Sequence, residues 1–427
     1  MRAMRSRGVA ALAALLALGL TACGSSVLHA SDAAAPPSAS AARLKAPVRP
    51  AFALASAPMA AAAAARLPTP PHVAGAGPLG GYAAPAVLYG VWDPRRGIAL
   101  RAYGIADRQT RAPARPDMTF RIGSLTKTFT ATAVLLLVDD GKVKLDAPVA
   151  RYVGALVDAL PGGRTATVRR LLNMTSGFAD YASRGDGPPA TVALAPRRIW
   201  TTAALVSAAA SERPNPSGAF AYSNTNYAIL GDLIERVSGM SYATFVKRRI
   251  LVPLGLRDTR IPEASATPPV QLHGYLNGMW ANYSPPPAQP VRDASQPGAD
   301  VTTWSTSVWG PAADGVSTLG DLARWAADDF GDVLLKPATR AARLRTVPAD
   351  SILKGSSYGL GLQIEHGWHW HVGEVDGWET LAMANPSTRQ AVVVVRSACC
   401  SSAFENYLTA RRAVPALAPI VDPVYGR

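Results

Sequence analysis

The chain has 427 residues, of which 48% are hydrophobic and 17% charged, so it is long enough to bury a large core in more than one lobe. Its 43 lysines and arginines outnumber its 29 aspartates and glutamates and give a formal net charge of +14. The basic residues are mostly scattered singly and no basic stretch alternates with aromatic residues, so we do not expect nucleic acid as a partner.

The N-terminus carries the pattern of an export signal. Three arginines within residues 1–7 precede an apolar stretch, Val9–Leu20, that is too short to span a bilayer and ends in Leu20-Thr-Ala-Cys23. We predict a lipoprotein signal peptide over 1–22, with Cys23 as the lipidated first residue of the mature chain. The alternative is an ordinary secretory signal in which the cysteine is there by chance. Lipidation would hold the protein at the membrane of the cell envelope, facing the periplasm or the exterior, and in a Gram-negative bacterium Gly24 would favour the outer membrane.

Composition then divides the rest of the chain. Residues 23–78 are rich in alanine, proline and serine and have few large apolar groups, which predicts a disordered tether. We expect one domain over 79–415, and a tail at 416–427. Within the domain the pattern predicts a mainly helical middle at 125–335 and a loop rich in tryptophan, proline and serine at 280–309. The predicted strands are 84–92, 97–104, 358–365, 368–377, 378–384 and 390–396, and the predicted final helix is 403–414.

A Ser-x-x-Lys motif is the first candidate for chemistry. Apolar residues recur at helical spacing through 118–141, with Gly123 before the helix and Gly141 after it. Ser124 and Lys127 therefore share one face at the helix N-terminus, where free N–H groups favour developing negative charge. Lys127 can act as a base only if burial or neighbouring cations lower its pKa. Otherwise Ser124 is a helix cap and Lys127 a solvated charge.

The second candidate is Tyr222-Ser-Asn224, which precedes a predicted helix at 228–239. Tyr222 and Asn224 are two apart in an extended or turn segment, so both side chains can point to one place. A tyrosine near cations can become a phenolate and relay protons, and an asparagine amide can hold a substrate carbonyl. The alternative is that Asn224 or Thr225 caps the helix and Tyr222 is a packing residue.

The third candidate is His371-Val-Gly373, in a strand of the C-terminal part. Gly373 has no side chain, so the backbone of a ligand can approach the strand closely. His371 can be a cation or a proton donor there. A zinc site is a weaker alternative, because His366, His369 and His371 cluster but lack a carboxylate-rich partner motif.

With these three motifs the chain resembles the serine β-lactamase and penicillin-recognising DD-peptidase superfamily, near its class C enzymes, DD-carboxypeptidases and esterases. The resemblance runs from about residue 84 to about residue 395. Further blocks that carry it are Phe120-Arg-Ile-Gly-Ser124, Leu171–Gly177 and Gly315–Ala323. It implies an α/β fold of β-lactamase/transpeptidase type: an antiparallel sheet flanked by helices, a mainly helical lobe, and the active site between them.

The resemblance also implies a mechanism, a two-step acyl transfer in which Ser124 attacks a carbonyl while Lys127 or Tyr222 takes its proton. Asn224, His371 and Gly373 would bind the substrate, and the N–H groups of Ser124 and Glu374 would hold the oxyanion. The substrate would be an ester, an amide or a peptide, including β-lactams and D-amino-acid peptides. We expect no cofactor and no metal, a small-molecule or peptide substrate, and a monomer.

One departure from the family concerns the substrate. Val372 stands where these enzymes usually have a threonine whose hydroxyl helps bind the substrate carboxylate, and valine donates no hydrogen bond. Glu374, just beyond it, would also disfavour an anion. These residues favour an ester or amide without that carboxylate.

Two further alternatives concern activity and cysteine chemistry. A non-catalytic binding or sensing lipoprotein on the same scaffold is the alternative function. For the adjacent Cys399 and Cys400 we expect buried thiols, with a bridge between the two as the alternative.

Overall fold

A computed structural model describes residues 84–399, except 183–186, 193, 264–266, 268, 277–298, 352–354 and 366. The predicted signal peptide, tether, final helix and tail lie outside the described residues, as does most of the 280–309 loop. Among the helices that are described, none is both long and apolar enough to cross a membrane.

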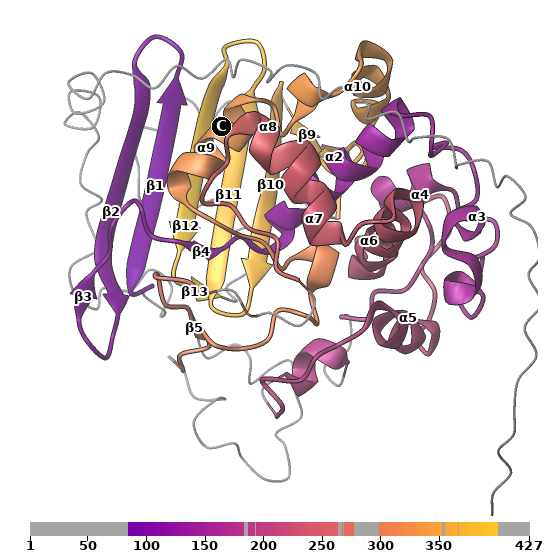
Figure 1. Ribbon diagram of the computed structural model, residues 1–427, viewed down its shortest axis with the longest axis horizontal. Helices are drawn as coiled ribbons and strands as arrows, with labels where there is room; N and C mark the ends of the chain where they lie inside the picture. Colours follow the sequence, from indigo (N-terminus) through magenta and orange to yellow (C-terminus); the bar gives the residue numbers. More distant parts are fainter. Residues whose placement is uncertain are drawn as a thin grey trace, which may run out of the picture. The chain divides into compact units, whose positions relative to one another are not determined.

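A large antiparallel sheet organises the described chain. Its strand order is β3-β2-β1-β12-β11-β10-β9-β8-β7, so the N-terminal strands pair directly with the C-terminal ones (Figure 1). The strands are β1 (Ala86–Asp93), β2 (Gly97–Asp107), β3 (Ala112–Pro113), β7 (Val347–Pro348), β8 (Ser357–Tyr358), β9 (Gln363–Glu365), β10 (Trp368–Val375), β11 (Trp378–Asn385) and β12 (Gln390–Arg396). Two short pairs lie apart from it: β4 (Phe120–Arg121) with β6 (Val316–Ser317), and β5 (Tyr275–Leu276) with β13 (Ala398–Cys399).

The strand predictions at both ends of the domain are confirmed, with one exception. The predicted strand at 358–365 is two strands, β8 and β9, separated by a turn. The N–H of Gly359 donates to the carbonyl of Leu362 across that turn and so reverses the chain.

The middle of the chain is mainly helical, as predicted, and Figure 1 shows α3 to α6 gathered at one side of the sheet. The helices are α2 (Thr126–Asp139), α3 (Ala150–Val153), α4 (Val168–Leu172), α5 (Thr202–Ala210), α6 (Asn224–Ser238), α7 (Tyr242–Val246), α8 (Val252–Leu254), α9 (Leu319–Ala327) and α10 (Pro337–Arg343). The shorter turns are 3₁₀ turns η1 (Gly123–Leu125), η2 (Gly154–Val157), η3 (Pro188–Thr191), η6 (Gly310–Ala312) and η7 (Asp332–Leu334), with a π-helical turn, η4 (Lys247–Leu251). The buried helix α2 packs against α6, and α9 packs on β1, β11 and β12.

The end of β10 brings the sheet to the helical part. Residues 371–375 pair with β11 but lie beyond the part of β10 that pairs with β9. A Cβ added to Gly373 would lie 2.0 Å from the carbonyl oxygen of Ile122, and one added to Gly123 would lie 2.6 Å from the N of Glu374. Thr380 Oγ1 also donates to the Ile122 carbonyl, at 2.8 Å. Only glycine at 123 and 373 lets η1 lie this close to β10.

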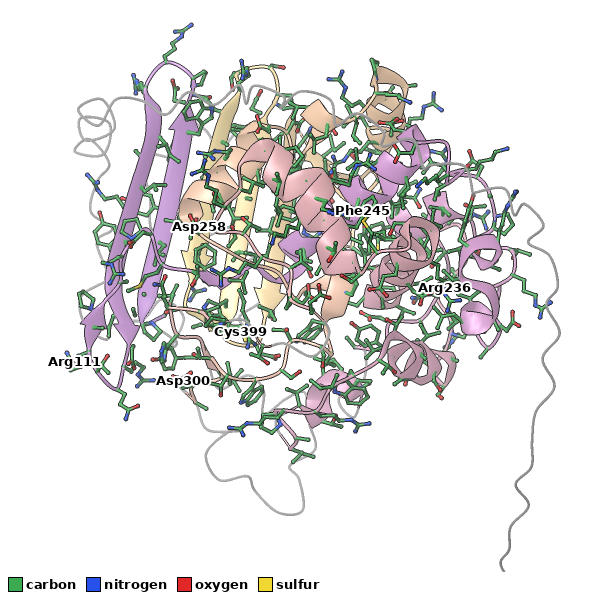
Figure 2. The ribbon with its side chains drawn as sticks, in the orientation of Figure 1. Arg111, Arg236, Phe245, Asp258, Asp300 and Cys399 are labelled. Atoms are coloured by element: carbon green, nitrogen blue, oxygen red, sulfur yellow. The ribbon has the colours of Figure 1, made fainter. Side chains whose placement is uncertain are left out.

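Cys399, labelled in Figure 2, is fully buried and disulfide-bonded, and its Sγ accepts a hydrogen bond from the N–H of Gly377 at 3.1 Å. The prediction of free thiols is therefore wrong for this residue. The chain's other cysteines, Cys23 and Cys400, lie outside the described residues.

Candidate active site

Ser124 lies in η1, the 3₁₀ turn that leads into α2, rather than in the first α-helical turn. It is partly exposed, whereas Lys127, one turn along on α2, is fully buried. The two side chains meet as the three-residue spacing predicts, with 3.0 Å between Lys127 Nζ and Ser124 Oγ.

Lys127 Nζ lies among three oxygen atoms. Besides Ser124 Oγ, it is 2.7 Å from Asn224 Oδ1 and 3.0 Å from the carbonyl oxygen of Ala312. Burial lowers the pKa of Lys127 to about 7, although the charge of Asp180 opposes the shift. The amide and carbonyl oxygens can only accept hydrogen bonds. A neutral Lys127 amine therefore donates its two hydrogens to them, which leaves its lone pair facing the Ser124 hydroxyl.

Asn224 is held by a residue that the sequence motifs did not indicate, Asp180. Asp180 Oδ1 accepts hydrogen bonds from the N–H groups of Asn224 and Ala182, both at 3.1 Å, and its Oδ2 accepts one from Asn224 Nδ2 at 3.0 Å. This contact fixes the orientation of the Asn224 amide, because Nδ2 is engaged and Oδ1 must face Lys127. Burial raises the pKa of Asp180, and the N–H groups that bind it oppose the shift.

Local structure around Asn224 differs from the prediction. Asn224 is the first residue of α6 instead of part of an extended segment, and Ser223 stands at the N-cap without a side-chain capping bond. Asp180, 44 residues earlier in the chain, accepts the hydrogen bond from the first N–H of the helix instead. Nothing in the local sequence pattern links two positions so far apart.

Tyr222 completes the group around the serine. Lys127 Nζ lies 4.7 Å from the centre of its ring, and its hydroxyl shares a hydrogen bond with Ser124. Burial raises the pKa of Tyr222 above its usual value of 10.0, and this effect exceeds the lowering by Ser124. The sequence-based expectation of a phenolate is therefore wrong: Tyr222 keeps its proton and can donate it.

His371 is close to Tyr222 but is not a cation. It is fully buried, and burial together with the charge of Lys127 lowers its pKa to about 3. Its Nδ1 faces the carbonyl oxygen of Val372, which can only accept, so Nδ1 carries the hydrogen. Nε2 then accepts a hydrogen bond from the hydroxyl of Tyr358, at 3.2 Å. His371 is therefore a neutral side chain, held by these two hydrogen bonds, and its ring centre lies 6.4 Å from that of Tyr222.

Val372 and Glu374 face away from His371, as alternation along a strand requires. Val372 packs against a cluster of buried hydrophobic residues that includes Trp370. Glu374 lies directly opposite Glu379 of the neighbouring strand β11. Burial, Glu379 and a nearby aspartate raise the pKa of Glu374 to about 8, so its carboxyl is largely neutral at pH 7. Glu374 therefore does not carry the full negative charge that the sequence suggested. Its backbone N lies beside Gly123, where the sequence predicted the second oxyanion donor.

The histidine cluster does not form a metal centre within the described residues, where no group of three or more histidine, cysteine or acidic side chains is arranged to hold an ion. His369 instead pairs with Asp329, at 2.7 Å between Nδ1 and Oδ1, and His366 lies outside the described residues.

The chain is similar to known proteins over most of its length. The family model named Beta-lactamase matches residues 58–398. The chain is 32% identical over 169 residues to Penicillin-binding protein 4* of Bacillus subtilis (strain 168), covering 39% of this chain and 36% of that protein. It is 28% identical over 327 residues to Unguisins hydrolase ungD' of Aspergillus campestris, covering 71% of this chain and 57% of that protein. The chain thus spans less than two thirds of either curated relative.

Solved structures match over more of their length. A D-stereospecific amidohydrolase from Streptomyces sp. is 27% identical, with a TM-score of 0.63, and the match covers 77% of this chain and 94% of that one. D-amino acid amidase from Ochrobactrum anthropi SV3, complexed with L-phenylalanine, is 25% identical with a TM-score of 0.68, covering 79% and 95%.

Proposed function

The chain belongs to the β-lactamase family, and from that premise we propose that it hydrolyses an amide or ester through an acyl-enzyme on Ser124. The observation that carries the proposal is the environment of Lys127. Its pKa of about 7 makes the neutral amine available, and its two acceptor-only neighbours leave the amine lone pair facing the Ser124 hydroxyl. A buried lysine with a depressed pKa is the kind of base that activates a serine.

In the proposed first step Lys127 takes the proton of Ser124 as Oγ attacks the substrate carbonyl carbon. The N–H groups of Ser124 and Glu374 stabilise the oxyanion, each contributing about 10²–10³ in rate. Tyr222 then protonates the leaving group, and the proton held by Lys127 restores Tyr222. In the second step Lys127 takes a proton from water as the water oxygen attacks the acyl carbon, and it passes that proton to Ser124 Oγ as the bond between Oγ and the acyl carbon breaks and the acid product leaves.

For the substrate we propose an amide or ester of a D-amino acid without a carboxylate next to the scissile bond. Support comes from His371, which is neutral at pH 7, and from Lys127, whose pKa of about 7 leaves it only half protonated there, so neither is a permanent cation for an anionic substrate. The similarity to a D-amino acid amidase and a D-stereospecific amidohydrolase favours the D configuration.

A substrate panel tests this choice. We expect turnover of D-phenylalanine amide and little turnover of L-phenylalanine amide, a D-alanyl-D-alanine peptide or a penicillin. Preferred turnover of the D-alanyl-D-alanine peptide would instead indicate a DD-carboxypeptidase, and preferred turnover of a simple activated ester would indicate an esterase. No turnover of any of them would favour the non-catalytic binding lipoprotein.

We also propose that the protein is lipid-anchored in the cell envelope, with Cys23 as the lipidated residue. The basis is the sequence pattern of residues 1–23 alone. Incorporation of labelled palmitate by the full chain, and its loss in Cys23→Ser, is the expected result. Equal labelling of both would refute the assignment.

A further inference from the structure

A cavity of about 690 Å³ lies between α7, η4, α8 and the loop that follows α8, and none of its lining residues belongs to the site described above. Its size falls in the range of small-molecule pockets. Figure 2 labels Phe245 on α7 and Asp258 on the loop, which locate the two sides of this region, although neither residue lines the cavity.

Positive charge dominates the rim of this cavity. Lys247, Arg257 and Arg260 line it and are exposed, and no hydrogen bond or ion pair within the described residues engages their charged groups. Glu263 is the one carboxylate in the lining, and it accepts a hydrogen bond from Ser241. Three cations and one carboxylate give the lining a formal charge of +2. By contrast, five other arginines that are at least partly exposed are paired with aspartates: Arg115, Arg164, Arg169, Arg236 and Arg249.

The floor of the cavity is apolar. Leu251, Leu256 and Ile261 line it and are 5%, 2% and 8% exposed. Val252 also lines it and is 67% exposed, so its side chain adds apolar surface at the opening. The cavity therefore offers an apolar surface below a cationic rim.

The cavity wall is preformed, because the loop after α8 is bonded to neighbouring elements. Asp321 Oδ2 on α9 accepts hydrogen bonds from the Asp258 N–H at 2.8 Å and from Thr259 Oγ1 at 2.9 Å. Arg260 exchanges two backbone hydrogen bonds with Val316 of β6, at 2.8 and 2.9 Å. The opposite wall includes η4, and π-helical turns are frequent at functional sites. A wall held in this way needs little ordering when a ligand binds.

We propose that this cavity is a binding site for a small organic carboxylate with an apolar chain. The carboxylate would lie among Lys247, Arg257 and Arg260, because a planar guanidinium group can donate two parallel hydrogen bonds to a carboxylate. The chain would cover Leu251, Leu256 and Ile261. An amphipathic anion fits both halves of the cavity, whereas inorganic phosphate would leave the floor uncovered and a neutral hydrocarbon would leave the cations unpaired.

Calorimetric titration of the full-length protein with octanoate tests the proposal. We expect saturable binding that is weakened about ten-fold or more in Arg257→Glu/Arg260→Glu. Arg248→Glu is the control, because Arg248 is exposed next to Lys247 on η4 but does not line the cavity. The affinity of this variant for octanoate should stay within about two-fold of wild type. Equal thermal midpoints of the three proteins would establish that the variants fold.

Comparison ligands separate the two halves of the proposal. Octanamide, which lacks the charge, and acetate, which lacks the chain, should each bind about ten-fold or more weakly than octanoate. Octanamide or acetate binding as tightly as octanoate would overturn it, as would equal octanoate affinity in all three proteins. Binding to anionic phosphatidylglycerol vesicles without binding to octanoate would assign the positive charge to a membrane surface and also overturn it.

Discussion

The contact between Asp180 and Asn224 gives the sharpest prediction about the site, through the substitution Asp180→Asn. The new amide has the same shape, and its oxygen can still accept from the N–H groups of Asn224 and Ala182. Its NH₂ group, however, replaces Asp180 Oδ2 and faces Asn224 Nδ2, 3.0 Å away, where two donors meet. Asn224 relieves this conflict by rotating its amide, which turns Nδ2 towards Lys127.

The rotated amide competes for the base. Asn224 would then donate a hydrogen bond to the Lys127 lone pair, which otherwise accepts the proton of Ser124. A lost or misdirected buried hydrogen bond costs about 1–3 kcal/mol, which corresponds to a decrease in kcat/KM of about 5- to 150-fold. The charge of Asp180 also raises the pKa of Lys127, so its removal moves the acidic limb of the pH–rate profile below pH 7.

The assay is the pH dependence of kcat/KM for a D-amino acid amide, measured for wild type and Asp180→Asn. Asp180→Asn/Asn224→Asp is the control, because it returns the carboxylate next to Lys127 and should move the acidic limb above pH 7. A merely structural role for Asp180 would lower the thermal midpoint without shifting the limb. An unchanged limb in Asp180→Asn, or a shift to higher pH, would refute the reasoning.

Three further predictions concern protonation. In wild type, kcat/KM should rise with pH through about 7, because Lys127 acts as a base only when neutral; a limb that falls there contradicts this role. Tyr222→Phe should lower kcat by about 10²–10⁴-fold for an amide, whose leaving group needs a proton, and by less for an ester with a good leaving group. Rate assays on both substrates measure the two losses, and equal losses would exclude Tyr222 as the acid. Glu374 has a folded-state pKa of about 8, above its usual 4.5, so its contribution to stability is fully present below pH 4.5 and is lost as pH rises through about 8. Urea denaturation should find that decline reduced in Glu374→Gln, and an identical decline in both proteins would contradict the assignment.

The local part of the site could be predicted from the sequence, because helix geometry fixes it. A spacing of three positions from Ser124 to Lys127 is enough to place their side chains together once a helix follows. The charge states could not be predicted in this way, since they depend on burial by distant segments. His371 loses its proton because surrounding elements enclose it, and Asp180 meets Asn224 only through the tertiary fold.

The strands, too, could be predicted from the sequence only in part. Strand β12 contains the continuous apolar run 391–395 and β11 the run 381–384, and both strands can be predicted from composition. The segment 358–365 has the composition of one strand, but the hydrogen bond from Gly359 to Leu362 turns the chain within it. A turn inside an apolar run leaves a weak sequence signal, because glycine is common in both settings.

Intact-protein mass spectrometry tests the central claim most directly. Wild type and Ser124→Ala would each be mixed briefly with an activated ester of a D-amino acid, quenched in acid and digested to locate any adduct. The account predicts an acyl adduct on the peptide that contains Ser124 in wild type and none in Ser124→Ala. Turnover by Ser124→Ala at the wild-type rate, or an adduct on another residue, would contradict it.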